Sequence, residues 1–196
     1  RGPSMLIVTP TRELAQQIDD VCRAVAARTG HVAVTVVGGV GYVPQKQALA
    51  RGCDILVATP GRLVDLMEQG SANLDEVSVL VLDEADRMLD MGFLPQVRRI
   101  VAGCREQRQT LLFSATLDEG RVGAITDLVR DPARVEIAPV TSTADTVEQY
   151  VLPVSRDAKN AALTAVLKKE GPERAIVFVR TKRRADTCAR RLSRAG

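Results

Sequence analysis

The sequence predicts an α/β fold in which a parallel sheet is covered by helices on both faces. Short apolar runs alternate with helix-like stretches along the whole chain of 196 residues, and repeated strand–helix alternation is typical of parallel sheets. Strands are expected at 5–8, 32–37, 54–58, 77–82, 109–113, 134–138, 147–153 and 174–179. Helices are expected at about 12–28, 43–51, 61–69, 85–90, 94–103, 119–130, 156–169 and 182–194.

One change of composition divides the chain. Residues 139–146 are small and polar, and they follow neither a helical nor a strand period. Such a segment is either a linker or an ordinary surface loop. We expect a linker, which would separate a first domain at 1–138 from the beginning of a second domain at 147–196.

The most informative segment is 79–86, which reads Val-Leu-Val-Leu-Asp-Glu-Ala-Asp. Its four apolar residues predict a strand that is buried on both faces. Asp83, Glu84 and Asp86 then lie at the edge of the sheet where α/β proteins bind ligands. Carboxylates there suit Mg²⁺, which takes one or two of them together with waters and phosphates. A helix whose first turn is acidic because of its dipole is the alternative.

Other strand ends carry hydroxyl groups, arginine or glycine. Thr9-Pro10-Thr11-Arg12-Glu13 follows the strand at 5–8, and Thr59-Pro60-Gly61-Arg62 follows the strand at 54–58. In both segments a hydroxyl cap and an arginine at a helix start could bind a phosphate. Gly38-Gly39 permits close backbone approach to a third phosphate, and the hydroxyls of Ser114-Ala115-Thr116 could bond the carboxylates at 83–86. The alternative for the hydroxyl-containing segments is an ordinary capped helix, and the alternative for Gly38-Gly39 is a simple turn.

Composition narrows the choice of partners. A net charge of +3 and a pI near 8.8 permit binding to nucleic acid. Aromatic residues make up 3% of the chain and tryptophan is absent, so nucleic acid should be bound through its backbone and not by base stacking. Four scattered cysteines and one histidine exclude a zinc site. The scattered cysteines are typical of free thiols in a reducing cytoplasm. No apolar run is long enough to predict a membrane span.

In their order and rough spacing, these motifs resemble those of DEAD-box ATP-dependent RNA helicases. The set comprises Pro10-Thr11-Arg12-Glu13-Leu14-Ala15, Gly38-Gly39, Thr59-Pro60-Gly61-Arg62, Asp83-Glu84-Ala85-Asp86 and Ser114-Ala115-Thr116. Segments 86–93 and 176–181 are also similar to that family. The resemblance implies a RecA-like parallel sheet that lacks its first, phosphate-loop strand, followed by the first strand–helix units of a second RecA-like domain.

The resemblance also implies the cofactors ATP and Mg²⁺ and a role for each residue. Asp83 would hold Mg²⁺ through water, and Glu84, beside the metal, would orient or deprotonate the water that attacks the γ-phosphate of ATP. Asp86, Ser114 and Thr116 would couple the state of ATP to RNA binding. Contacts to the RNA backbone, independent of base sequence, would come from Thr11, Arg12, Gly38, Gly39, Thr59, Pro60, Gly61 and Arg62.

Two parts of the family's machinery are not found in the sequence. It contains no Gly-x-x-x-x-Gly-Lys-Ser/Thr phosphate loop, and the segment that would carry the arginine fingers is missing. We therefore expect a fragment with little or no ATPase activity by itself, whose parent unwinds or remodels RNA duplexes using ATP. The alternatives are a non-hydrolysing single-stranded RNA-binding module derived from a helicase and a nucleotide-independent interaction domain.

Overall fold

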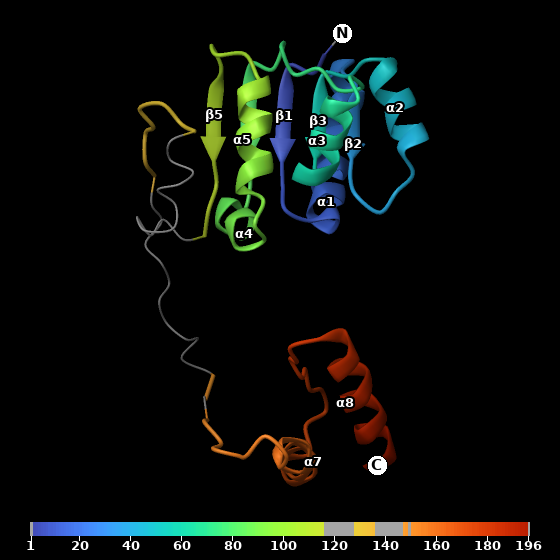
Figure 1. Ribbon diagram of the computed structural model, residues 1–196, viewed down its shortest axis with the longest axis vertical. Coiled ribbons are helices and arrows are strands. Elements are labelled where there is room, and N and C mark those ends of the chain that lie inside the picture. Colours follow the sequence, from blue (N-terminus) through green and yellow to red (C-terminus); the bar gives the residue numbers. More distant parts are fainter. Residues whose placement is uncertain (1, 116–127, 136–146, 149, 196) are drawn as a thin grey trace. The chain divides into compact units, whose positions relative to one another are not determined.

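The computed structural model describes residues 2–115, 128–135, 147–148 and 150–195 (Figure 1). The chain separates into two compact units, one formed within residues 1–135 and the other within 136–196. Most of the helix expected at 119–130, part of the strand expected at 134–138 and the linker expected at 139–146 lie outside the described residues.

The first unit contains a sheet of five strands, and all of them run in the same direction (Figure 1). Their order across the sheet is β2-β3-β1-β4-β5, so β1 is central and β5 forms an edge of the described sheet. The parallel α/β architecture predicted from the sequence is confirmed. The strands are β1 (Met5–Val8), β2 (Ala33–Val36), β3 (Ile55–Ala58), β4 (Val79–Leu82) and β5 (Gln109–Leu112).

Helices cover both faces of this sheet, as predicted. Successive side chains of a strand point to opposite faces. In β1, Leu6 and Val8 therefore enter one core cluster while Ile7 packs against another. The smaller cluster lies beneath α1 (Arg12–Thr29). The larger cluster is completed by α2 (Tyr42–Ala50), α3 (Pro60–Glu68), α4 (Ala85–Asp90) and α5 (Leu94–Gly103).

The second unit contains the helices α7 (Lys159–Glu170) and α8 (Lys182–Ala195). Residues 174–179 and the described part of 147–153, both predicted as strands, are not strands. An apolar run becomes a strand only when a neighbouring backbone pairs with its N–H and C=O groups. The described residues of this unit contain no such neighbour. Throughout the described parts of the chain, no helix has the length and apolar character needed to span a membrane.

Candidate functional site

The segments that carry the predicted site residues all emerge at one edge of the sheet. The five strands are parallel, and their last residues lie side by side: Val8 pairs with Ala58 and with Leu82, and Leu82 pairs with Leu112. Beyond these last residues, further backbone hydrogen bonds continue the pairing: Asp83 N–H donates to Val8 O at 2.9 Å, and Thr9 N–H donates to Ala58 O at 3.0 Å. In Figure 1 the strand arrows point towards this edge, where α4 lies.

Asp83 and Glu84 follow β4 and are both partly exposed. Asp83 Oδ1 accepts the N–H of Glu84 at 3.0 Å. Glu84 itself has a left-handed backbone, with φ 48° and ψ 52°. Its Oε2 lies 3.2 Å from Arg87 Nη1, one turn along α4. The carboxylate of Glu84 is therefore oriented by both an unusual backbone and an ion pair.

The donor set around Asp83 and Glu84 suits a hard cation that shares its ligands with a substrate. In the described parts of the chain, no group of three or more His, Cys, Asp or Glu side chains could hold a metal ion. A cation at this position would take the rest of its oxygen ligands from water and from bound phosphate, as Mg²⁺ commonly does. The carboxylates fit that arrangement.

The segment that carries Ser114 lies against the beginning of α4. Phe113 donates its N–H to Leu82 O, and Phe113 O accepts the N–H of Ala85, each at 2.9 Å. These two bonds fasten the end of β5 to the segment that contains Asp86. Asp86 Oδ1 accepts the N–H of Arg87 at 3.0 Å. Thr116, the third residue predicted to couple ATP to RNA, lies outside the described residues.

A second group of site residues forms around Gly39. The α1 helix begins at Arg12, and Thr11 caps it by accepting the N–H of Leu14 at 3.3 Å. The exposed Arg12 side chain reaches the turn after β2, where a Cβ added to Gly39 would lie 3.1 Å from Arg12 Nη1. Gly39 has φ +75°, a conformation that glycine adopts readily. The structure thus brings Arg12 and Gly38-Gly39 together from separate strand ends.

Arg62 reaches the same turn from α3. It is only 8% exposed, its Nη1 donates to Val40 O at 2.9 Å, and its Cζ lies 3.9 Å from the ring centroid of Tyr42. Pro60 occupies the first helical turn, as the sequence suggests, and Thr59 is at the N-cap. The hydroxyl cap expected from Thr59 is wrong, because its side chain makes no capping hydrogen bond. Proline at the helix start has no N–H, so it leaves fewer donors that need a cap.

Sequence reasoning missed two residues that support this turn, Tyr42 and Gln45. The Tyr42 hydroxyl donates to Asp65 Oδ2 at 2.9 Å, and the Tyr42 ring packs against the Arg62 guanidinium in a cation–π contact. Gln45 is 6% exposed and bonds to backbone groups on both sides of the two glycines. The only available signal was a polar residue within a short helix, which usually indicates a solvated surface position.

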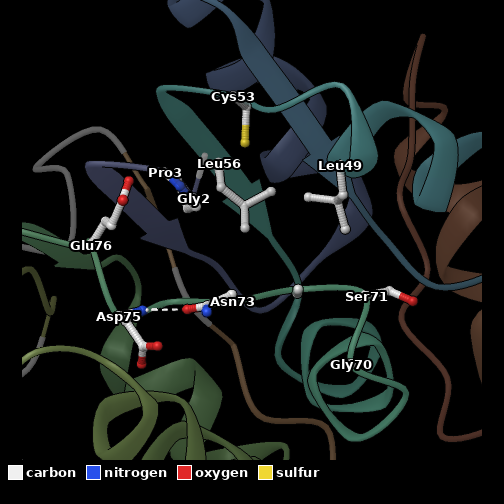
Figure 2. A pocket seen from close by; sticks show the side chains of 11 residues that line it. Gly2, Pro3, Leu49, Cys53, Leu56, Gly70, Ser71, Asn73, Asp75 and Glu76 are labelled. Carbon is white, nitrogen blue, oxygen red and sulfur yellow. Dashed lines mark hydrogen bonds between the residues drawn. The ribbon is translucent and has the colours of Figure 1, made fainter.

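A hollow of about 400 Å³ lies at the opposite edge of the sheet, where the strands begin (Figure 2). Leu49, Cys53 and Leu56 form its apolar wall, and the polar residues beside it include Asn73 and Asp75. Figure 2 shows the bond from Asp75 N–H to Asn73 Oδ1, which measures 2.7 Å. None of the predicted site residues lines this hollow, so it is separate from the candidate site.

Comparison with known proteins agrees with the motifs at the carboxyl edge. The family model described as DEAD/DEAH box helicase matches residues 1–123. The chain is 46% identical over 197 aligned residues to the ATP-dependent RNA helicase RhlB of Pseudomonas aeruginosa, covering 99% of this chain and 50% of that protein. It is also 46% identical over 183 residues to RhlB of Pseudomonas putida, covering 92% of this chain and 46% of that protein.

A third relative, RhlB of Pseudomonas syringae pv. tomato, is 44% identical over 197 residues, which cover 99% of this chain and 50% of that protein. The chain thus spans about half the length of the curated relatives that it matches. Since the family model covers more than half of the chain and includes the Asp83–Asp86 segment, the chain belongs to the DEAD/DEAH box helicase family.

Proposed function

We propose that this chain is part of an ATP-dependent RNA helicase that separates or remodels RNA duplexes through ATP hydrolysis. The observation that carries the proposal is that two groups of site residues lie at the same edge of the sheet. The first contains Asp83 and Glu84 after β4, in which Leu80 and Leu82 are buried while Val79 and Val81 are only partly buried, so the predicted full burial on both faces is wrong. The second is the turn at Gly39, which Arg12 and Arg62 approach from different strand ends. The names of the relatives favour this function over that of a non-hydrolysing RNA-binding module.

The first group would handle the nucleotide. When bound, ATP with Mg²⁺ supplies a phosphoryl group whose transfer to water releases free energy. Asp83 would hold Mg²⁺ through water. Glu84, next to the metal, would orient the attacking water or accept its proton. The ion pair between Glu84 and Arg87 supports this role by limiting the orientations of the carboxylate.

The second group would bind the RNA backbone. Arg12 provides exposed positive charge, Arg62 adds the charge of a largely buried guanidinium, and exposed Gly38-Gly39 allows a phosphate to approach backbone N–H groups. Contacts to phosphate and ribose carry no base sequence information, so binding would be largely independent of sequence. The proposed contacts also include the partly exposed Thr11 and Gly61, and Thr59 and Pro60, which are buried beside Gly61.

The segments at 83–86 and 113–114 would couple nucleotide and RNA. The bond from Ala85 N–H to Phe113 O supports this coupling, because a shift of one segment would displace the other. Asp86, Ser114 and Thr116 are the side chains we assign to it. We also propose that residues 1–138 form part of the N-terminal RecA-like domain, and that 147–196 begin the C-terminal one after a linker at 139–146. A cytoplasmic location suits the four free cysteines.

The proposal is tested in the helicase that contains this chain by the change Glu84→Gln. We expect RNA-stimulated ATP hydrolysis to fall by at least about 100-fold, a loss typical for a general base, and separation of a short RNA duplex to stop. RNA binding in the presence of a non-hydrolysable ATP analogue should remain. Malachite-green phosphate release and a fluorescent strand-displacement assay measure the two activities.

The matched control is Glu76→Gln, which neutralises an exposed carboxylate just before β4, at the opposite edge of the sheet. Hydrolysis by this variant should equal that of the unmodified protein. Normal hydrolysis by Glu84→Gln would contradict the assigned role, and an unmodified protein that separates no duplex would contradict the proposed function.

A further inference from the structure

Gln45 is a buried polar residue that the roles assigned above do not use. It lies on α2 and is 6% exposed. Its Oε1 accepts the N–H of Val37 at 3.1 Å. Its Nε2 donates to Val37 O and to Gly41 O, each at 3.2 Å. One amide group therefore joins the end of β2 to the beginning of α2 across the Gly38-Gly39-Val40 turn.

The bridged turn needs such support because of its composition. Residues 38–41 read Gly-Gly-Val-Gly, and glycine loses more conformational freedom than any other residue when it is fixed. Val36, just before Val37, is the last residue of β2, and beyond it the turn is exposed. Side-chain hydrogen bonds hold this turn at three points: Gln45 bonds to Val37 and Gly41 at its two ends, and Arg62 bonds to Val40 O.

The position of this turn decides whether Gly39 meets Arg12. These two residues come from different strand ends, and Arg12 Nη1 lies against Gly39 at a distance that would leave little room for a side chain. If the turn moved, the glycine backbone and the guanidinium would no longer face the same phosphate. Fixing the turn before RNA arrives lowers the entropy lost on binding.

We propose that Gln45 is a positioning residue that holds the Gly38–Gly41 turn in its RNA-binding conformation. It acts through the backbone of Val37 and Gly41 and does not itself touch RNA. This inference rests on the proposed function, because it assumes that the turn binds the RNA backbone.

The test measures the affinity of the helicase that contains this chain for fluorescein-labelled single-stranded oligouridine by fluorescence anisotropy. We expect Gln45→Ala to raise Kd about tenfold. This change in binding free energy is close to the net contribution of a single hydrogen bond. The control is Gln47→Ala, which removes an exposed glutamine from the same helix and should leave Kd unchanged. Hydrogen exchange at the Val37 amide should accelerate in Gln45→Ala and not in Gln47→Ala.

A double-mutant cycle distinguishes positioning from a general loss of stability. Gly39→Ala places a Cβ at φ +75° and against Arg12, so it should weaken RNA binding through the turn itself. In that background Gln45→Ala should change Kd less than about twofold, because residues that act through one element are not additive. If Gln45→Ala does not fold, Gln45→Glu takes its place, since it keeps the acceptor for Val37 N–H and loses both donors.

The outcomes separate the inference from the proposed function. If the unmodified helicase does not bind oligouridine, the proposed function fails and the role of Gln45 fails with it. If the unmodified helicase binds and its Gln45→Ala variant binds equally tightly, the proposed function stands and the role of Gln45 is overturned. Additive effects of Gln45→Ala and Gly39→Ala would also overturn it.

Discussion

At the scale of single residues, Glu84 has a backbone conformation that disfavours its side chain. Its φ of 48° lies in the left-handed region, where a Cβ contacts the following carbonyl and costs about 1–2 kcal/mol. Most other described residues with positive φ are glycines. Strained conformations persist where the surrounding structure imposes them, often at functional sites. The strain at Glu84 is therefore consistent with a position selected for chemistry at the expense of stability.

Two separate substitutions of Glu84, one by glycine and one by alanine, measure this strain. Glu84→Gly and Glu84→Ala both remove the carboxylate and its ion pair with Arg87, but only alanine keeps a Cβ. We expect the glycine variant to be more stable than the alanine variant by about 1 kcal/mol, as measured by urea unfolding. Both variants should lose hydrolysis in the parent helicase. Equal stability of the two variants would show that the backbone at residue 84 is unstrained.

At the scale of elements, α3 and α5 pack against each other through apolar side chains. Leu63 and Leu66 of α3 and Val97 and Ile100 of α5 are fully buried, and within each helix the two residues are three apart, so they share a face. The helices are also joined by an ion pair between Glu68 and Arg99, whose side chains remain 48% and 59% exposed. Burial should contribute far more than this ion pair to holding α3 and α5 on the sheet.

Two substitutions on α5 compare these contributions. Ile100→Ala should lower the free energy of unfolding by about 2–5 kcal/mol, because it leaves a cavity in a fully buried position. Arg99→Ala should lower it by less than about 1 kcal/mol, because the pair is exposed to water. Urea unfolding followed by circular dichroism gives both values. A larger loss from Arg99→Ala than from Ile100→Ala would contradict this account of the packing.

At the scale of the whole molecule, buried thiols make stability depend on pH. Burial, together with the nearby negative charge of Asp54, raises the pKa of Cys53 from an ordinary value of 9.0 to about 11. Burial likewise raises the pKa of Cys104 to about 11. Both thiols lie in the main core, so their ionisation would place a charge among apolar side chains.

The sign of the effect follows from the raised pKa values. Above about pH 9.0 the thiols of the unfolded chain lose protons while those of the folded chain keep them, so their contribution to stability is present below about pH 9.0 and is lost as the pH rises towards 11. We expect the free energy of unfolding to fall over this range. Urea titrations at several pH values measure it.

The double variant Cys53→Ala, Cys104→Ala is the control for this prediction. All other ionisable groups are common to the two proteins, so the difference in slope isolates the two thiols. The double variant should be less stable at neutral pH, because it loses buried volume, but its stability should depend less on pH above about pH 9. Parallel curves for the two proteins would contradict the assignment.

The sequence by itself determined the parallel sheet, the described helices of the first unit and the common edge of the motif segments. Runs such as Val79–Leu82 are apolar throughout, and the chain alternates them with helices, a pattern typical of a parallel sheet covered on both faces. Local patterns were sufficient there because the spacing of apolar residues along the chain matches the spacing of the residues that become buried. They failed at 174–179, where strand formation requires a partner backbone that the pattern cannot specify.

Only the tertiary structure decided how the separate strand ends combine. Arg12 and Gly39 are far apart in sequence, and Arg62 and Val40 are 22 residues apart, yet each pair is in contact because the sheet order brings β1, β2 and β3 together. The burial of Gln45 and the stacking of Arg62 on Tyr42 depend on the same order. Side-chain partners are set by which strands become neighbours, and that choice is made by the packing of the whole core.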